Sequence, residues 1–550
     1  MSLVPEYRYF TADIIAGTIV AEIPFQSVSW ERKINAAGSF SGSIAANAAD
    51  YESDHFDLYN NTLPGRYALY VMRDGVCVWG GIIWGRDYDI VEKNLTVNAL
   101  EFISYFFHRT FWKTLTTDEY QAVNNSTSGS DADTIKSFLE GLITSVSNDQ
   151  SAIETDAIAY AASDVHCRIK SYARDAGGIA TLVTRSEPCG FAVGDSVYIY
   201  GVPVAEFNGT HTVDSVTSDG FTFTYNDGIT SGSAITTTTI SETVTSYAVL
   251  SSTKTLLETN ANIRLTTDIS TELDNYVTNA RGEENPFVFR GSDARYVGDI
   301  FKDFADSGVP CKPITARADI DPEVTIRFDY YIESSYDELT QTFSNVFKAW
   351  LVKKDINNPS YVGSRALSEL YGYSELDATN FIFEHPGNIV SFSLNENADA
   401  AATRTWMIDS KNDLGDEAKK YYGAYTNIPY LNNDFPILET LITDVDLAVS
   451  LDSQIAPYAK QYSYRLSPPV GDYSFTVNGS LHPKVGTYTP GDWCIITSDD
   501  AFISARMKPP FENRTGLLVR KIRGFKVSVP DNPSFPETVD LDVVPEWEDL

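Results

Sequence analysis

The chain has 550 residues, of which 75 are acidic and 41 basic, and its formal net charge at pH 7 is −34. This charge argues against broad contact with a nucleic-acid backbone, because such contact needs clustered Lys and Arg. The length predicts about three or four domains, each able to bury its own core. The aromatic content of 13% favours strand-rich cores and large subunit interfaces over a helical fold.

Cysteine usage predicts folding in a reducing cytoplasm. The five cysteines are odd in number and lie far apart, which indicates neither a disulfide framework nor a CxxC metal site: Cys77, Cys167, Cys189, Cys311 and Cys494. No basic segment precedes an apolar stretch at the N-terminus, and no run of about 18 apolar residues occurs. We therefore expect neither a signal peptide nor a membrane-spanning segment.

The first hundred residues predict a small β-barrel built from short strands at 18–25, 30–34, 40–44 and 67–73. Asp74-Gly75 follows as a type I′ hairpin signal, because both central positions need a positive φ. In the returning strand, Gly80-Gly81 predicts a bulge or a corner where the sheet turns.

Aromatic residues crowd the next segment too densely for an exposed loop, and we expect them to cover the barrel core: Phe102, Tyr105, Phe106, Phe107, Phe111 and Trp112. A helix is predicted at 133–146 from the spacing of Ile135, Phe138, Leu139, Leu142 and Ile143. Strands and turns then alternate from 178 to 225 as an inserted β module. Its Ser/Thr-rich continuation to 253 predicts an exposed strand edge or a tether.

Two amphipathic helices are expected next. Ser292 can cap the first, and Gly308 can end it; its apolar face comprises Tyr296, Val297, Ile300, Phe301 and Phe304. A capping box, Ser335-x-x-Glu338, predicts the second helix, with an apolar stripe of Leu339, Phe343, Val346, Phe347 and Trp350. After Phe381 the β pattern resumes. The last 20 residues contain seven acidic residues and no basic one: Asp531, Glu537, Asp540, Asp542, Glu546, Glu548 and Asp549.

The predicted fold class is mainly β with α+β elements, arranged in five parts along the chain. The expected parts are an N-terminal β-barrel at 1–115, a helical connector at 116–177, an inserted Ser/Thr-rich β module at 178–253, an α+β domain with the two amphipathic helices at 254–380, and a second β-barrel with a helix near 451–464 at 381–550.

No enzyme motif with specific spacing occurs, and Gly38-Ser39-Phe40-Ser41-Gly42 carries Phe where a GxSxG motif needs its nucleophile. The histidines are single, and we expect structural roles for them: His55, His108, His166, His211, His385 and His482. We therefore expect no enzyme, and we predict no catalytic, cofactor-binding or metal-binding residues and no cofactor.

Two groups of residues permit a carbohydrate-directed alternative. Asp299, Asp303 and Asp306 share a helix face, as paired glycosidase carboxylates would, although a solvated face explains them more simply. The tyrosines of one C-terminal segment could stack on sugar rings, although such stretches more often form protein interfaces; they are Tyr421, Tyr422, Tyr425 and Tyr430.

Two groups of segments, one near each end of the chain, form a recognisable order. Near the N-terminus they are 30–32, 40–44, 70–75 and 78–84, with the strings "YVMRDG" and "VWGGIIW". Near the C-terminus they are 488–493, 520–524 and 543–547, with "YTPGDW" and "VVPEW". These segments resemble the tail-hub or minor tail proteins of siphophages that infect actinobacteria. In addition, 194–213 is similar to β modules found inside many phage structural proteins.

The resemblance implies a hub with two tube-like β-barrels, three copies of which form a pseudo-sixfold ring at the virion tail tip after assembly in the host cytoplasm. The implied partners are a distal tail protein, a tape-measure protein, and receptor-binding or tail-fibre proteins; the host cell surface is a further candidate. DNA would pass through the lumen without specific binding. The alternatives are a glycan-binding or cell-wall-degrading tail protein, then an extracellular adhesin, with a cytoplasmic enzyme last.

Overall fold

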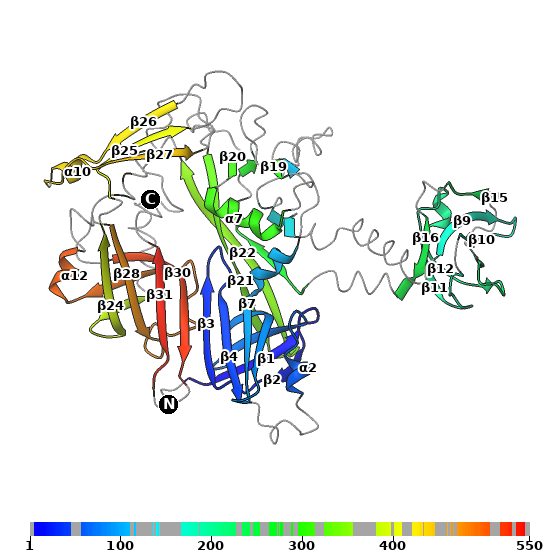
Figure 1. Ribbon diagram of the computed structural model, residues 1–550, viewed down its shortest axis with the longest axis horizontal. Helices are drawn as coiled ribbons and strands as arrows, with labels where there is room; N and C mark the ends of the chain where they lie inside the picture. The colour runs from blue at the N-terminus through cyan, green and yellow to red at the C-terminus, as the bar shows by residue number, and fades with distance from the viewer. Residues whose placement is uncertain are drawn as a thin grey trace. The chain divides into compact units, whose positions relative to one another are not determined.

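The computed structural model confirms the predicted fold class: the chain is mainly β, with several sheets and few helices (Figure 1). The structure describes residues 5–45, 57–109, 115–116, 136, 139–140, 142–143, 167–185, 188–226, 234–241, 246–252, 263–271, 273, 276–278, 288–289, 295–307, 309–313, 324–355, 381–397, 401–409, 421–432, 434–445, 459, 463, 466, 470–506, 518–530 and 535–544.

The chain divides into two compact units. One unit combines Met1–Leu142 with Arg264–Leu550, and the other is the inserted segment Ile143–Ile263. An inserted β module was expected at 178–253, so the compact inserted unit extends further in both directions than that range.

The N-terminal strands form the first part of the larger unit. They are β1 (Tyr7–Asp13), β2 (Ile19–Glu22), β3 (Ser27–Lys33), β4 (Ser39–Ala45), β5 (Tyr67–Arg73), β6 (Val76–Asp89) and β7 (Asn94–Glu101), with the short helix α2 (Leu58–Asn61) before β5. Asp74 and Gly75 both have positive φ values, 49° and 85°, which confirms the predicted turn between β5 and β6.

The strand is not broken at Gly80-Gly81, because β6 runs through both glycines. Its irregularities flank them: the register against β5 shifts between Val71 and Met72, and the register against β7 shifts between Ile83 and Gly85. Close packing explains the two glycines instead. A Cβ on Gly80 would lie 2.2 Å from Ser334 Oγ, and one on Gly81 would lie 2.2 Å from the Leu100 carbonyl oxygen. Glycine here permits close approach rather than a break in the strand.

The C-terminal strands continue the same sheet. β3 pairs antiparallel with β30 (Leu518–Val529), and the sheet order is β2-β1-β5-β6-β7-β4-β3-β30-β31-β28-β24 (Figure 1). The further strands of this sheet are β23 (Ile382–His385), β24 (Ile389–Asn397), β28 (Val470–Asn478), β29 (Trp493–Ser498) and β31 (Thr538–Val544), with the helix α12 (Ala501–Arg506) after β29.

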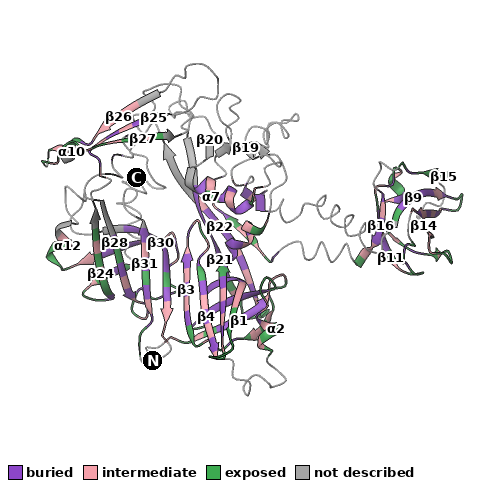
Figure 2. Ribbon diagram, viewed as in Figure 1, coloured by how far each residue is buried: buried purple, intermediate pink, exposed green. Residues whose placement is uncertain are grey.

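One hydrophobic core serves both ends of the chain. Trp30 of β3 meets Phe525 of β30 edge to face, with ring centroids 5.8 Å apart, and Phe525 in turn contacts Tyr488. Figure 2 shows the buried residues alternating along β3 and β4, as a sheet with one buried face requires. The strands expected for two separate barrels therefore share one sheet and one core.

The second amphipathic helix predicted at 335–350 is wrong, because β21 (Val324–Asp337) and β22 (Thr342–Asp355) form a long antiparallel hairpin there. Phe343, Phe347 and Ala349 alternate as buried residues along a strand, although several apolar positions also fit a helical spacing. Ser335 does not cap a helix; its hydroxyl bonds that of Ser344 across the hairpin. Fourteen cross-strand residue pairs outweigh the local helical signal.

The first amphipathic helix is confirmed as α7 (Val297–Ser307), whose Val297, Ile300, Phe301 and Phe304 are buried. Tyr296, expected on the same face, is 45% exposed, and Ser292 and Gly308 lie outside the described residues. The expected aromatic cover forms the 3-10 helix η1 (Phe102–His108). Phe106 of η1 lies edge to face against Phe301 of α7, 5.2 Å between centroids. Phe111 and Trp112 lie outside the described residues.

Smaller sheets complete the larger unit. β17 (Thr266–Ile269), β20 (Val309–Pro313) and β18 (Tyr276–Thr278) extend the β21–β22 hairpin, and β8 (Leu115–Thr116) pairs with β19 (Val288–Phe289). β25 (Arg404–Asp409) lies between β26 (Tyr421–Thr426) and β27 (Glu439–Val445), near the helix α10 (Ile428–Leu431).

Two further predicted helices fall mostly outside the described residues. Of the helix expected at 133–146, Leu139, Leu142 and Ile143 are helical and buried. Of the helix expected near 451–464, the structure describes Ala459 and Ser463, and both are helical. Within the described part of the chain, no helix is long and apolar enough to cross a bilayer.

The inserted unit is a β module with its own core around Leu182, Phe207 and Tyr225. Its strands are β9 (Cys167–Arg174), β10 (Ile179–Thr184), β11 (Ser196–Tyr200), β12 (Gly209–Thr212), β13 (Ser215–Val216), β14 (Thr222–Asn226), β15 (Ile235–Thr239) and β16 (Tyr247–Leu250), with the 3-10 helix η2 (Ala205–Phe207). β9 pairs with β10, β15 and β16, although it lies in the range expected to form a helical connector.

Replacing Gly80 with Ala should lower the free energy of unfolding by about 1–3 kcal/mol, because the added methyl group overlaps Ser334 and Tyr70. Gly85→Ala is the matched control in the same strand, since no atom lies within 4 Å of its added Cβ. Chemical denaturation of both variants checks this. Equal stability of the two variants would contradict the packing role of Gly80.

Candidate functional site

A buried ion pair joins the β5–β6 hairpin to the segment that leads into the last strand. Arg73 ends β5, and Glu537 immediately precedes β31. Arg73 Nη2 lies 2.5 Å from Glu537 Oε1, and Arg73 Nε lies 3.3 Å from the other carboxylate oxygen. The two side chains are only 6% and 1% exposed. The guanidinium therefore binds the carboxylate through two donors, out of contact with solvent.

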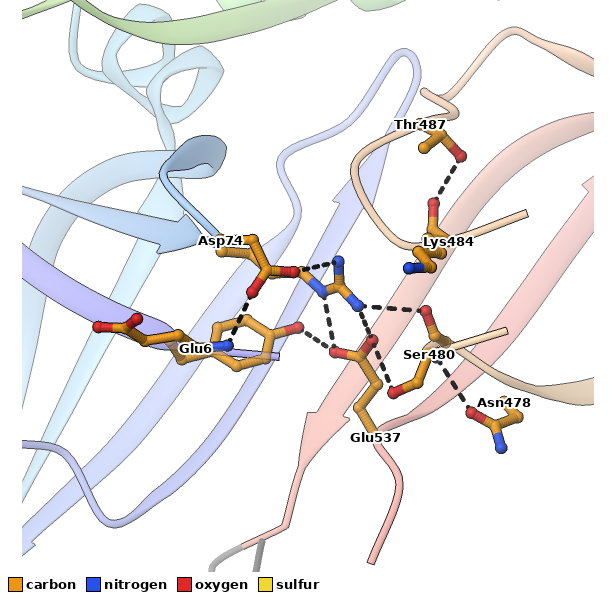
Figure 3. Close-up of polar contacts among 10 residues, drawn as sticks. Glu6, Asp74, Asn478, Ser480, Lys484, Thr487 and Glu537 are labelled. Carbon is orange, nitrogen blue, oxygen red and sulfur yellow. Dashed lines mark hydrogen bonds and ion pairs between the residues drawn. The ribbon is translucent and has the colours of Figure 1, made fainter. Parts of the chain in front are cut away.

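Neighbouring groups complete what we call the seam, defined as Tyr7, Arg73, Gly479, Ser480 and Glu537. The Tyr7 hydroxyl donates a hydrogen bond to Glu537, and Arg73 Nη2 also donates to the Gly479 carbonyl oxygen at 3.4 Å. The Ser480 hydroxyl lies 3.5 Å from Glu537 Oε1. Figure 3 shows the Glu537 carboxylate at the centre of these contacts.

The β5–β6 turn is tied to the same place. Arg73 Nη1 donates to Asp74 Oδ2 at 3.2 Å, and Asp74 Oδ1 accepts from the Glu6 amide at 2.9 Å (Figure 3). The Asp74 amide donates in return to the Glu6 carbonyl oxygen. The chain just before β1 is thereby fixed beside the seam.

The seam requires the sheet to curl. In the sheet order β5 and β31 are separated by β6, β7, β4, β3 and β30, yet Arg73 contacts Glu537 directly. Among the described strands the ladder passes from one end of the chain to the other through β3 and β30. Side chains of the seam hold the curled sheet where it returns on itself.

Electrostatics keep Tyr7 neutral and Arg73 charged in the seam. Burial, and then the charge of Glu537, raise the pKa of Tyr7 far above its usual range, so the phenol stays protonated and donates its hydrogen bond. Burial alone would lower the pKa of Arg73, but the hydrogen bond and charge of Glu537 outweigh it and raise that pKa. The neutral Tyr7 hydroxyl and the positively charged Arg73 guanidinium thus both donate hydrogen bonds to the Glu537 side chain.

A second buried ion pair connects the β21–β22 hairpin to β30. Lys521 Nζ contacts Asp329 Oδ2, and both side chains are almost fully buried. Asn35 Nδ2 donates to the other oxygen of Asp329 at 2.7 Å, while Asn35 Oδ1 accepts from the Tyr330 amide at 3.0 Å. Asn35 has a φ of 58° in the turn between β3 and β4. The same turn also contacts β30, because the Ile34 amide donates to the Arg523 carbonyl oxygen at 2.9 Å.

A third pair holds the same turn from the other side. Arg32 Nε lies 3.4 Å from Glu101 Oε1, and Glu101 Oε2 accepts from the Gly38 amide at 2.8 Å. Burial raises the pKa of Glu101 to about 7, while Arg32 and the Gly38 amide act in the opposite direction. The three pairs together bring β3, β5, β7, β21, β30 and β31 into fixed positions.

This arrangement can position strands, because each buried charge faces an opposite charge and further donors. The acids and tyrosines that would suit a carbohydrate-directed role are not among the residues of these three ion pairs. Asp303 of α7 pairs with Arg295, which precedes the helix, at 2.5 Å, and the side chain of Asp306 lies outside the described residues. Tyr425 is half-buried on β26, and the side chains of Tyr421, Tyr422 and Tyr430 are not among those described.

Three of the described histidines contact an aromatic ring or a carboxylate. His108 stacks on Trp84, and His211 stacks on Tyr225. His385 Nδ1 lies 3.8 Å from Asp499, and both side chains are well exposed. Across the described residues no three His, Cys, Asp or Glu side chains form a group that could hold a metal ion. The expectation of no catalytic, cofactor or metal site stays a prediction.

Sequence reasoning missed the seam. Arg73 lies in the Arg-Asp-Gly string that marks the hairpin turn, and Glu537 is one of seven acids in the last 20 residues. One acid among several in an acidic segment gives no sign that its side chain is buried against a residue 464 positions away.

The chain is similar to several solved structures of tail proteins. A tail protein from Neisseria meningitidis MC58 shares 8% identity at a TM-score of 0.38, covering 99% of this chain and 98% of that one. The 43 kDa tail protein of prophage MuSo2 from Shewanella oneidensis shares 9% sequence identity at a TM-score of 0.39, and the match covers 99% of each chain. Prophage tail protein gp18 from Listeria monocytogenes EGD-e shares 8% sequence identity at a TM-score of 0.38, and the match covers 98% of this chain and 95% of gp18. No protein-family model and no curated protein gives a significant match.

Glu537→Gln should lower the free energy of unfolding by about 3–5 kcal/mol, because it removes the buried counter-charge of Arg73 and leaves the guanidinium only the half-exposed Asp74 carboxylate. Glu22→Gln breaks the Arg8 ion pair, whose side chains are 51% and 48% exposed, and should cost less than about 1 kcal/mol. Urea denaturation of both variants measures the difference. Similar small losses in the two would show that the seam is dispensable.

Glu101 should make stability fall as pH rises from about 4.5 to about 7, since its pKa is about 7 in the folded chain and near 4.5 when unfolded. Within this window the folded state binds more protons than the unfolded state, so raising the pH costs the folded state about 1.4 kcal/mol per unit at most. Glu101→Gln removes the titration. The stability of the natural protein relative to this variant should therefore decrease across the window, and a constant difference would contradict the assignment.

Proposed function

We propose that the chain is a structural hub, or minor tail protein, at the tail tip of a long non-contractile phage that infects an actinobacterium. Three copies would form a pseudo-sixfold ring that closes the tail tube and opens for DNA ejection. The ring would anchor the distal tail protein, the tape-measure protein and the receptor-binding or tail-fibre proteins, and it would assemble in the host cytoplasm.

The observation that carries the proposal is the direct pairing of the two chain ends that resemble hub proteins. Trp30 of the N-terminal segment pairs with Val527, and Arg32 pairs with Phe525, next to the C-terminal "RKIRG" string. The same strands share one core. Two barrel-like halves fused in one sheet are suited to a wall element of a ring, since each copy then contributes two similar parts to the pseudo-sixfold arrangement.

The acidic charge supports a conduit role. With a net charge of −34, carboxylates facing the lumen would keep DNA from adhering while it passes. The buried ion pairs suit the same task, because they fix strand positions in a protein that has to keep its shape within an assembly.

Electron microscopy of phage particles that contain this chain tests the proposal. We expect a threefold ring of the chain at the end of the tail. Purified protein that stays a monodisperse monomer and binds or cleaves cell-wall glycan would contradict the hub and favour the glycan-directed alternative.

A further inference from the structure

The tip of the β6–β7 hairpin exposes an apolar patch. Ile90 and Val91, in the turn between the strands, are 70% and 82% exposed. Tyr88 at the end of β6 and Tyr59 on α2 are also more than half exposed. Single exposed apolar residues are ordinary, but three within four positions at one hairpin tip place an unusual amount of apolar side chain in water.

This surface continues the buried face of the sheet. Tyr88 pairs across the hairpin with Leu95, and Arg86 pairs with Val97; Leu95 and Val97 are both core residues. Cross-strand partners share a face, so Tyr88 extends the core face beyond the covered part of the sheet. Arg86 lies over the Tyr59 ring, 4.4 Å from its centroid, and donates to the Tyr59 carbonyl oxygen at 2.5 Å.

The turn holds its apolar residues in place. Asp89 Oδ1 accepts hydrogen bonds from the Val91 amide at 2.7 Å and the Glu92 amide at 3.0 Å. A fixed turn loses little conformational entropy when it binds, so Ile90 and Val91 are prepared to act as anchors. Solubility alone would favour polar residues at these two positions.

Carboxylates ring the patch. Asp87, Asp89 and Glu92 flank the tip, and Asp57 precedes Tyr59 on α2. Lys93 is the single cation of the turn, since Arg86 is held against α2 by Tyr59 and Thr62. An apolar centre with an acidic rim fits a partner that has an apolar pocket with a basic rim.

We propose that the β6–β7 tip inserts Ile90 and Val91 into a basic-rimmed apolar pocket on a different protein of the same particle. The inference rests on the proposed function and names a contact surface for it. Two copies of this chain that met at this tip would bring the same acidic residues together. We therefore assign the pocket to another, more basic protein.

Photo-crosslinking within assembled particles tests the assignment. With p-benzoylphenylalanine in place of Val91, the cross-link should join a peptide of another particle protein that contains Lys or Arg beside apolar residues. The same probe at Ser218, an exposed polar turn of the inserted module, is the control and should not reach that peptide. Cross-links only to this chain, or none at all, would overturn the inference.

A charge substitution gives an independent readout. Val91→Asp should reduce incorporation of the chain into particles at least tenfold without changing its thermal unfolding, because the side chain is exposed. Leu339→Asp at the β21–β22 tip, where the side chain is 96% exposed, is the matched control and should leave incorporation unchanged. Unchanged incorporation of Val91→Asp would overturn the inference alone. Absence of the unaltered chain from particles would instead contradict the proposed function.

Discussion

The contact between Arg73 and Glu537 joins the end of β5 to the start of β31, two strands that are separated by five others in the sheet order. On one side the two halves are joined by backbone pairing, from Val28 with Val529 to Lys33 with Gly524. On the other side they meet through side chains at the seam. A curled sheet with one apolar face needs both connections, because the core between them would otherwise open to water.

Buried ion pairs place the strands more than they stabilise them. Removing two charges from water offsets much of their attraction, so a pair adds little net stability, while a mismatched arrangement that leaves one charge alone is costly. Each of the three pairs joins segments distant in sequence: Arg73 with Glu537, Asp329 with Lys521 and Arg32 with Glu101. The last two converge on the β3–β4 turn, where Asn35 and Gly38 are hydrogen-bonded.

Local rules predicted much of the β structure and little of its assembly. The alternation of buried and exposed strand residues and the Asp74-Gly75 turn could be predicted from the sequence. Both depend only on neighbouring residues, through the two-residue repeat of a strand and the positive φ values of the turn. The prediction of a helix beginning at Ser335 was wrong. The apolar positions from Leu339 to Trp350 fit a helical spacing, and the sequence does not show that this segment pairs with β21 as a strand. Glu537 could not be found from sequence, because its burial depends on Arg73, a residue at the opposite end of the chain.

Hydrogen exchange of the intact protein at increasing denaturant concentrations tests the shared core most directly. If both chain ends belong to one sheet and one core, amides in β5 and in β31 should become exchangeable together, with the same opening free energy and the same denaturant dependence. Full protection of β5 at concentrations where β30 and β31 already exchange would show two independent barrels and contradict the account.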